Sequence, residues 1–273
     1  MRINNNVMAA NAYRNLSNTN NTLGKSLEKL SSGFRINRAA DDAAGLTRSE
    51  GLRAEINGSK QAIRNAQDGV SFVQTAEGAA NEVHAILQRM RTLAVSASNG
   101  TSDGVAEQAE VDELLAELDS IGTRTTFNGN AVFKDYGATG AAMSFHIGAG
   151  SSDTLDITAD LSLASDNVFG ATGLEAMDLG TAAAAAIETI DDAIAQVSKS
   201  RSTLGATQNR LDHAIANVSV AMENLSAAES RIRDADIAEE MVSFTRNQIL
   251  QQAGTAMLAQ ANQVPQGVLS LLR

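Results

Sequence analysis

The sequence predicts a mainly α-helical protein: a long antiparallel helical hairpin or coiled-coil bundle that carries one small β-hairpin. Apolar residues recur at steps of three and four near both ends of the chain, as in the seam of a coiled coil. The 273 residues include one Pro, although average usage of about 5% predicts roughly 14. Seven Phe, two Tyr and no Trp leave aliphatic side chains to supply most of the burial.

The first long helix is predicted from an apolar stripe over residues 9–34. Gly33 and the segment 34–45 break the periodicity, and Gly45 and Gly51 weaken a helix locally. We therefore expect a linker here. The stripe consists of Ala9, Tyr13, Leu16, Leu23, Leu27, Leu30 and Phe34, with polar Asn20 in its largest gap.

A second helical stripe follows and stops at Asn99–Gly100, a pair typical of a helix end or turn. Its members are Leu52, Ile56, Ile63, Ala66, Val70, Val73, Val83, Ile86 or Leu87, Met90, Leu93 and Ala97. Asp103 is a candidate cap for a shorter helix, in which Glu107 and Glu110 occupy favourable early positions. The apolar face of this shorter helix holds Val111, Leu114, Leu115, Leu118 and Ile121.

The periodicity changes from helical to alternating after a turn signal at residues 126–130. Residues 143–147 and 154–158 alternate apolar and polar side chains around a loop rich in Gly and Ser, which predicts a β-hairpin. Helix returns at Thr181, and its apolar face carries Ile187, Ile190, Ile194 and Val197.

The stretch from Leu204 to Arg273 is predicted to be one helix that runs nearly to the end of the chain. At 1.5 Å per residue it would be about 100 Å long, so a compact monomer cannot cover its stripe and partner helices are needed. The stripe of residues 9–34 is its natural partner. The seam consists of Leu204, Leu211, Ile215, Val218, Met222, Leu225 and Ile232, and it resumes at Leu250, Ala253, Met257, Ala261, Val264, Val268 and Leu271.

Composition excludes several classes of function. Residues 101–200 hold 17 acidic and 3 basic residues, which predicts a solvated acidic face and argues against binding of nucleic acid. The chain has no Cys, no HExxH pattern and three widely separated His, so neither a metal nor any other cofactor is expected. We expect no cleaved leader and no membrane insertion, because no basic-plus-apolar opening segment and no 18-residue apolar run are found.

The chain is not expected to be an enzyme. Asp41–Asp42 and Asp191–Asp192 are paired carboxylates, but adjacent side chains on a helix point in different directions and no nucleophile accompanies them. We interpret them as solvated or capping groups. The glycine-rich residues 137–150 lack the Lys of a P-loop, which favours a flexible loop.

Long motifs at both ends of the chain resemble those of bacterial flagellin. The N-terminal motifs are INNN at 3–6, LEKLSSGFRIN at 27–37, AADDAAGL at 39–46 and IRNAQDGV at 63–70. The C-terminal motifs are AAESRIRDADIAEEM at 227–241 and ANQVPQGVLSLL at 261–272. The match covers roughly residues 1–135 and 180–273, and the short segment between them leaves no room for the larger outer domains of many family members.

This resemblance implies a structural subunit of the bacterial flagellar filament, which assembles into a helical tube used for swimming. It implies an inner terminal-helix domain, a paired coiled coil of residues 1–43 plus 233–273, and an outer helical domain of residues 44–232 with the β-hairpin near 143–158. The protein would pass through the flagellar type III export channel and reside in the extracellular filament. The alternative is a hook-filament junction protein, which shares the terminal helices but does not polymerise indefinitely. A grafted enzyme domain is not expected, because the variable middle is too short for one.

The resemblance also implies partners and contact residues. The partners are other flagellin subunits, the flagellar cap, the hook-junction proteins, an export chaperone and the vertebrate flagellin-sensing Toll-like receptor. On this match Arg89, Leu93 and Glu110 fall at positions for contact between protofilaments and with the receptor, although Thr92 replaces an acidic residue of many receptor-active members. The residues expected to pack between subunits are Leu16, Leu23, Leu27, Leu30, Phe34, Leu250, Met257, Val264, Val268 and Leu271.

Overall fold

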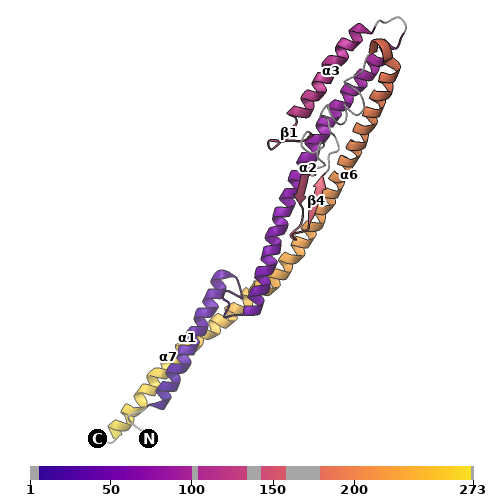
Figure 1. The fold of residues 1–273 in the computed structure, drawn as a ribbon. Helices are drawn as coiled ribbons and strands as arrows, with labels where there is room; N and C mark the ends of the chain where they lie inside the picture. Colours follow the sequence, from indigo (N-terminus) through magenta and orange to yellow (C-terminus); the bar gives the residue numbers. More distant parts are fainter. Residues whose placement is uncertain (1–5, 100–103, 134–142, 158–178, 272–273) are drawn as a thin grey trace. The chain divides into compact units, whose positions relative to one another are not determined.

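The computed structural model describes residues 6–99, 104–133, 143–157 and 179–271, without the side chains of residues 180–181 and 265–271. The elements are α1 (Val7–Ser32), α2 (Ala43–Ala97), α3 (Val105–Arg124), β1 (Thr126–Phe127), β2 (Asn130–Ala131), β3 (Met143–His146), β4 (Thr154–Ile157), α6 (Leu179–Arg233) and α7 (Ile237–Leu271) (Figure 1). The predicted fold class is confirmed, because the chain is mainly helical, its long helices pack in pairs, and a small antiparallel hairpin is present.

The chain divides into two compact units. The terminal unit consists of Met1–Glu55 and Asn224–Arg273, and the central unit consists of Ile56–Glu223. α2 and α6 each contribute residues to both units.

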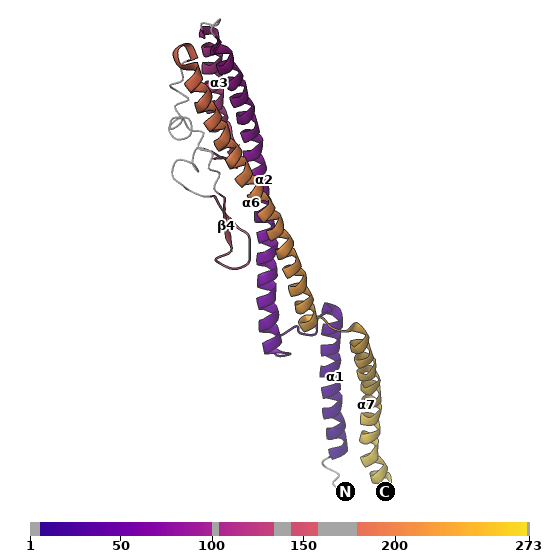
Figure 2. The same cartoon turned by 90° about the vertical axis from the view of Figure 1, so that its right-hand side faces the viewer.

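One apolar core holds the central unit together. α2 and α6 lie side by side along it (Figure 2), and α3 contributes the buried side chains of Val111 and Leu118. The periodicity predicted for α2 is confirmed, since Val73, Val83 and Met90 are completely buried. The buried residues of α6 include Ile190, Val197, Leu204 and Leu211, which are all members of the predicted stripes.

The predicted turn at residues 126–130 is confirmed, and it joins two short antiparallel strands. Asn128 and Gly129 have φ values of 51° and 83°, the left-handed conformation that a type I′ hairpin turn requires at both central positions. The predicted hairpin is confirmed as well: β3 pairs with β4 in antiparallel register, with Met143 opposite Ile157. The expected cap Asp103, the strand end Thr158 and the loop residues 137–142 lie outside the described residues.

The linker after α1 is shorter than predicted, because α2 begins at Ala43 and includes both Gly45 and Gly51. A carboxylate oxygen of Asp42 accepts a hydrogen bond from the Gly45 backbone N–H at 2.9 Å, which stabilises the first turn of α2. Gly45 is required for close packing, since a Cβ atom there would lie 2.7 Å from Cδ1 of the buried Ile36.

The prediction of one continuous helix from residue 204 is wrong. α6 ends at Arg233 and α7 begins at Ile237. The carboxylate of Asp236 accepts hydrogen bonds from Ala238 N (2.9 Å) and Glu239 N (3.3 Å), so it satisfies backbone donors that a new helix start leaves open. Glu239 and Glu240 in the first turn favour the same start through the helix dipole. α7 then continues past Pro265 to Leu271.

Candidate assembly surface

α1 and α7 of the terminal unit pack against each other in antiparallel directions (Figures 1 and 2). The side-chain amide of Asn6 donates to Ala261 O at 2.7 Å. Further along, Leu16 lies against Gly254, and Lys29 Nζ lies 3.8 Å from Glu240 Oε2. Residue numbers therefore rise along α1 as they fall along α7, which confirms the N-terminal stripe as the partner of the α7 part of the C-terminal stripe. The earlier part of that stripe, at Leu204 and Leu211, packs in the core of the central unit instead.

Both ends of α1 are capped by groups that its sequence supplies. Asn6 Oδ1 accepts from Ala9 N at 3.1 Å, so this one side chain caps α1 and also joins it to α7. At the other end Gly33 adopts a left-handed conformation (φ 75°), and its N–H donates to Lys29 O at 2.8 Å. The positive charge of Lys29 in the last turn complements the helix dipole.

The helix pair has almost no core of its own. Within the described side chains of α1 and α7, the buried ones are Ser26 and Ala261. Eleven large apolar side chains on these two helices instead have 44–65% of their surface exposed. They are Val7, Met8, Tyr13, Leu27, Ile237, Met241, Val242, Ile249, Leu250, Met257 and Val264. We call this set the assembly surface, since exposed apolar surface of such extent is typical of interaction sites.

Two open grooves of similar size lie on the assembly surface. One, of about 470 Å³, runs between the helices and is lined by residues that include Met8, Leu16, Leu250 and Met257. The other, of about 460 Å³, lies on α7 alone and is lined by Met241, Val242, Thr245, Arg246, Ile249 and Leu250. Leu250 lines both grooves, so a side chain inserted into either would contact it.

The residues predicted to pack between subunits fall into two groups in this structure. Leu16, Leu23, Leu30 and Phe34 are half-buried by contacts within the chain. Leu27, Leu250, Met257 and Val264 are exposed. The side chains of Val268 and Leu271 lie outside the described part of α7. Their role between subunits stays a prediction.

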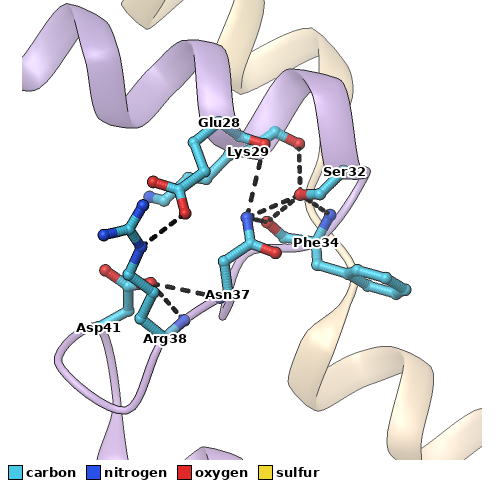
Figure 3. A network of polar contacts seen from close by, with 7 residues as sticks. All are labelled: Glu28, Lys29, Ser32, Phe34, Asn37, Arg38 and Asp41. Atoms are coloured by element: carbon cyan, nitrogen blue, oxygen red, sulfur yellow. Dashed lines mark hydrogen bonds and ion pairs between the residues drawn. The ribbon is translucent and has the colours of Figure 1, made fainter.

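The segment between α1 and α2 is fixed by a polar network (Figure 3). Asp41 Oδ2 accepts from the backbone N–H groups of Asn37 (3.2 Å) and Arg38 (3.0 Å). The Arg38 N–H bond is the largest cause that lowers the pKa of the Asp41 carboxyl. Asn37 Nδ2 donates to Ser32 Oγ at 2.7 Å, and Arg38 Nε donates to Glu28 Oε1 at 2.8 Å, so both residues join the linker to α1.

Arg233, the last residue of α6, joins three parts of the terminal unit. Its guanidinium lies 4.9 Å from the centre of the Phe34 ring, a cation–π geometry, and its Nη1 donates to Glu50 Oε1 at 2.9 Å. The backbone pairs here as well, because Arg35 N donates to Arg233 O at 2.7 Å and Phe34 forms a β-bridge with Asp234. This junction was not predicted from the sequence, although Arg233 and Phe34 belong to the long motifs at 227–241 and 27–37.

Two ion pairs lie among the described residues of the central unit. Arg89 Nε donates to Glu110 Oε1 at 2.7 Å, so two of the three residues expected at protofilament contacts are brought together on exposed faces of α2 and α3. The third, Leu93, is 7% exposed and belongs to the core. The second pair was not predicted from the sequence. In it Arg91 Nε donates to Asp191 Oδ1 at 2.6 Å, and this hydrogen bond lowers the pKa of the Asp191 carboxyl.

The described residues were searched for metal sites and membrane-spanning helices. They contain no group of three or more His, Cys, Asp or Glu that could hold a metal ion. Among the helices as far as they are described, none is long and apolar enough to span a membrane. The main feature of the terminal unit is therefore its exposed apolar surface.

Comparisons with known proteins point to one family. Residues 3–138 match the model of the bacterial flagellin N-terminal helical region, and residues 187–272 match that of the bacterial flagellin C-terminal helical region. The chain is 52% identical to a flagellin from Halalkalibacterium halodurans and 46% identical to a flagellin from Bacillus subtilis. It is 48% identical to the flagellar filament 33 kDa core protein of Treponema phagedenis. Each of these alignments covers 100% of both chains.

Proposed function

Because this chain belongs to the bacterial flagellin family, we propose that it assembles by burying the assembly surface of α1 and α7 against neighbouring copies of itself. The chain is a structural subunit of the flagellar filament. A hook-filament junction protein is not favoured, since relatives that match over the whole chain are flagellins and filament core proteins.

The observation that supports this proposal is the contrast between the side chains that α1 and α7 bury and those that they leave exposed. The described side chains that α1 and α7 bury are small, whereas Met8, Tyr13, Ile249 and Met257 remain at least 60% exposed. Burying such a side chain contributes about 1.5 to 3 kcal/mol, so a neighbouring copy that covered the surface would stabilise both molecules. If the surface and its counterpart occupy different parts of the molecule, and the rotation between copies does not close a ring, the contact repeats and a helical polymer results.

We propose that the two domains predicted from the sequence occupy different layers of the filament. Residues 1–43 plus 233–273 form the inner wall of the tube, and residues 44–232 form the outer domain. The contacts that hold the inner wall are made by Leu16, Leu23, Leu27, Leu30, Phe34, Leu250, Met257, Val264, Val268 and Leu271. This proposal is supported by the half-buried or exposed state of the eight whose side chains are described, which leaves surface on each for a partner.

Export and partners are part of the same proposal. The filament lies outside the cell, and a chain whose terminal helices hold few buried contacts is easily kept unfolded for passage through the flagellar export channel. An export chaperone would cover the apolar face of α7 before assembly. The cap and the hook-junction proteins would meet the same helices at the two ends of the filament. No enzymatic activity is proposed.

A second contact is proposed at Arg89, Leu93 and Glu110. The exposed Arg89–Glu110 pair presents charge toward a neighbouring protofilament, and the same surface would be offered to a vertebrate flagellin-sensing Toll-like receptor. Leu93 supports this surface from within, because its side chain packs in the core beneath it.

Electron microscopy of the concentrated, purified chain tests the proposal. Long filaments are expected. A chain without residues 264–273 should form none, because it loses the apolar end of α7. Its central unit should keep its helical circular-dichroism signal. Dispersed molecules from the full chain under conditions that preserve its helices, or normal filaments from the shortened chain, would contradict the proposal.

A further inference from the structure

Three methionines are exposed on the two terminal helices. Met8, Met241 and Met257 have 65%, 48% and 62% of their surface exposed, whereas Met90 is completely buried in the core of the central unit. Met8 and Met257 line the groove between α1 and α7, and Met241 lines the groove on α7. The two grooves of the assembly surface thus both carry thioethers that solvent can reach.

We propose that Met8, Met241 and Met257 form an oxidation-sensitive site, at which a peroxide converts the thioethers of the free subunit to sulfoxides and thereby blocks assembly. The inference rests on the proposed function, since it requires that a neighbouring copy covers the grooves. Peroxide then oxidises the assembly surface of the free subunit, whereas the same surface is protected from peroxide in the polymer.

The chemistry needs hydrogen peroxide as the oxidant and no group from the protein. The methionine sulfur attacks one peroxide oxygen, the O–O bond breaks, and proton transfer to the departing oxygen releases water. Sulfur loses two electrons and the peroxide is reduced, so each thioether and each H₂O₂ give one sulfoxide and one water. A sulfoxide reductase with a thiol reductant reverses the change.

Oxidation opposes packing because a sulfoxide is more polar than a thioether. A thioether fits an apolar groove because it is flexible and has only a weak acceptor. A sulfoxide carries a strong acceptor oxygen, which loses its hydrogen bonds to water when an apolar neighbour covers it. Four of the six residues that line the α7 groove are apolar, namely Met241, Val242, Ile249 and Leu250, and the other two are Thr245 and Arg246. Oxidation at this position therefore opposes the burial that assembly requires.

The test compares free subunits with filaments of the full chain. Both are treated with dilute hydrogen peroxide, and sulfoxide at each methionine is followed by peptide mass spectrometry. We expect oxidation at Met8, Met241 and Met257 to be slower in filaments by about tenfold or more, because oxidation follows exposure. Met90 should stay reduced in both. The oxidised subunits are then assayed for assembly before and after treatment with methionine sulfoxide reductases.

A variant with Met8→Leu, Met241→Leu and Met257→Leu keeps the apolar volume and removes the oxidisable sulfur. Its assembly after peroxide is compared with that of its own untreated sample. We expect peroxide to cause no further loss, while Met222→Leu, a control at a half-buried position of α6, stays as sensitive as the original chain. The inference is overturned if the oxidised original chain assembles normally, or if the triple variant loses assembly after peroxide as the original chain does. Failure of the untreated original chain to assemble would instead count against the proposed function.

Discussion

Leu16 of α1 packs directly on Gly254 of α7, where a Cβ atom added to the glycine would lie 3.2 Å from Leu16 Cδ1. At this point Leu16 faces the α7 backbone, with no side chain of residue 254 between them. Leu16 and Gly254 both line the groove between the helices, so this contact forms part of the wall of that groove.

Replacing Gly254 with Leu should separate the helix pair and weaken the filament. Leu favours a helix more than Gly does, so any loss must come from overpacking, which typically costs about 1 to 3 kcal/mol. Gly24→Leu is the matched control on α1, because a Cβ atom there meets nothing within 4 Å. Filaments of the Gly254 variant should dissociate at a lower temperature than those of the control. Equal dissociation temperatures would show that this contact is unimportant.

Two glycines of α2 should respond in opposite ways to the same change. Gly45→Ala places its new methyl group against Ile36 and Asp42, so we expect a destabilisation of about 1 to 3 kcal/mol. Gly51→Ala meets no neighbour and should stabilise the helix by about 0.5 to 1 kcal/mol. Hydrogen exchange over residues 43–55 measures both effects. Slower exchange in both variants would mean that Gly45 is not needed for packing.

Loss of the Arg89 charge should weaken contacts between protofilaments while sparing the folded subunit. Arg89 and Arg91 both form exposed ion pairs, which contribute little to stability because water screens the charges, so Arg89→Ala and Arg91→Ala should unfold in urea almost as the original chain does. The filament of the Arg89 variant should dissociate at a lower temperature than that of the Arg91 variant.

Leu93 needs a separate variant, because its truncation opens a cavity in the core and costs about 2 to 5 kcal/mol in the subunit itself. A combined Arg89 and Leu93 variant would mix the two effects. If the Arg89→Ala filament is as stable as the original one, the proposed contact is refuted.

The linker between α1 and α2 should loosen in acid. Hydrogen bonds from Arg38 N and Asn37 N lower the pKa of Asp41 in the folded chain, so its contribution to stability is present above about pH 4 and is lost as the pH falls through the lowered pKa. The amide NMR signals of Asn37 and Arg38 should shift over this range. In Asp41→Asn they should already have shifted at neutral pH and then stay constant. Unchanged titration in that variant would assign the effect to another group.

The sequence predicts the parts of this fold that depend on local pattern. Helical periodicity identifies the buried positions of α2, such as Val73 and Val83, because a repeat of apolar side chains on one face needs a core to cover it. The Asn128–Gly129 turn is predicted for an equally local reason, since few residues accept a positive φ.

The break between α6 and α7 was not predicted, because the prediction of one continuous helix used only the spacing of apolar residues. The Asp236-x-x-Glu239 pattern of a helix start and the gap in the seam between Ile232 and Leu250 were available as signals. The contact of Arg233 with Phe34 could not be predicted, since it joins residues far apart in the chain and leaves no periodic trace. The sequence pattern also does not identify what covers the exposed face of α7, because in the proposed assembly a second copy of the chain covers it.

Hydrogen exchange of the same peptides in the free subunit and in the filament tests the central claim, which is that α1 and α7 obtain their missing core from neighbouring copies. In the free subunit, residues 7–32 and 237–264 should exchange within seconds, because few buried contacts hold these helices closed. Residues 56–97, with the core of the central unit behind them, should exchange slowly in both states. In the filament the terminal helices should become as protected as residues 56–97. If they are already fully protected in the free subunit, or stay unprotected in the filament, α1 and α7 do not assemble in the way proposed.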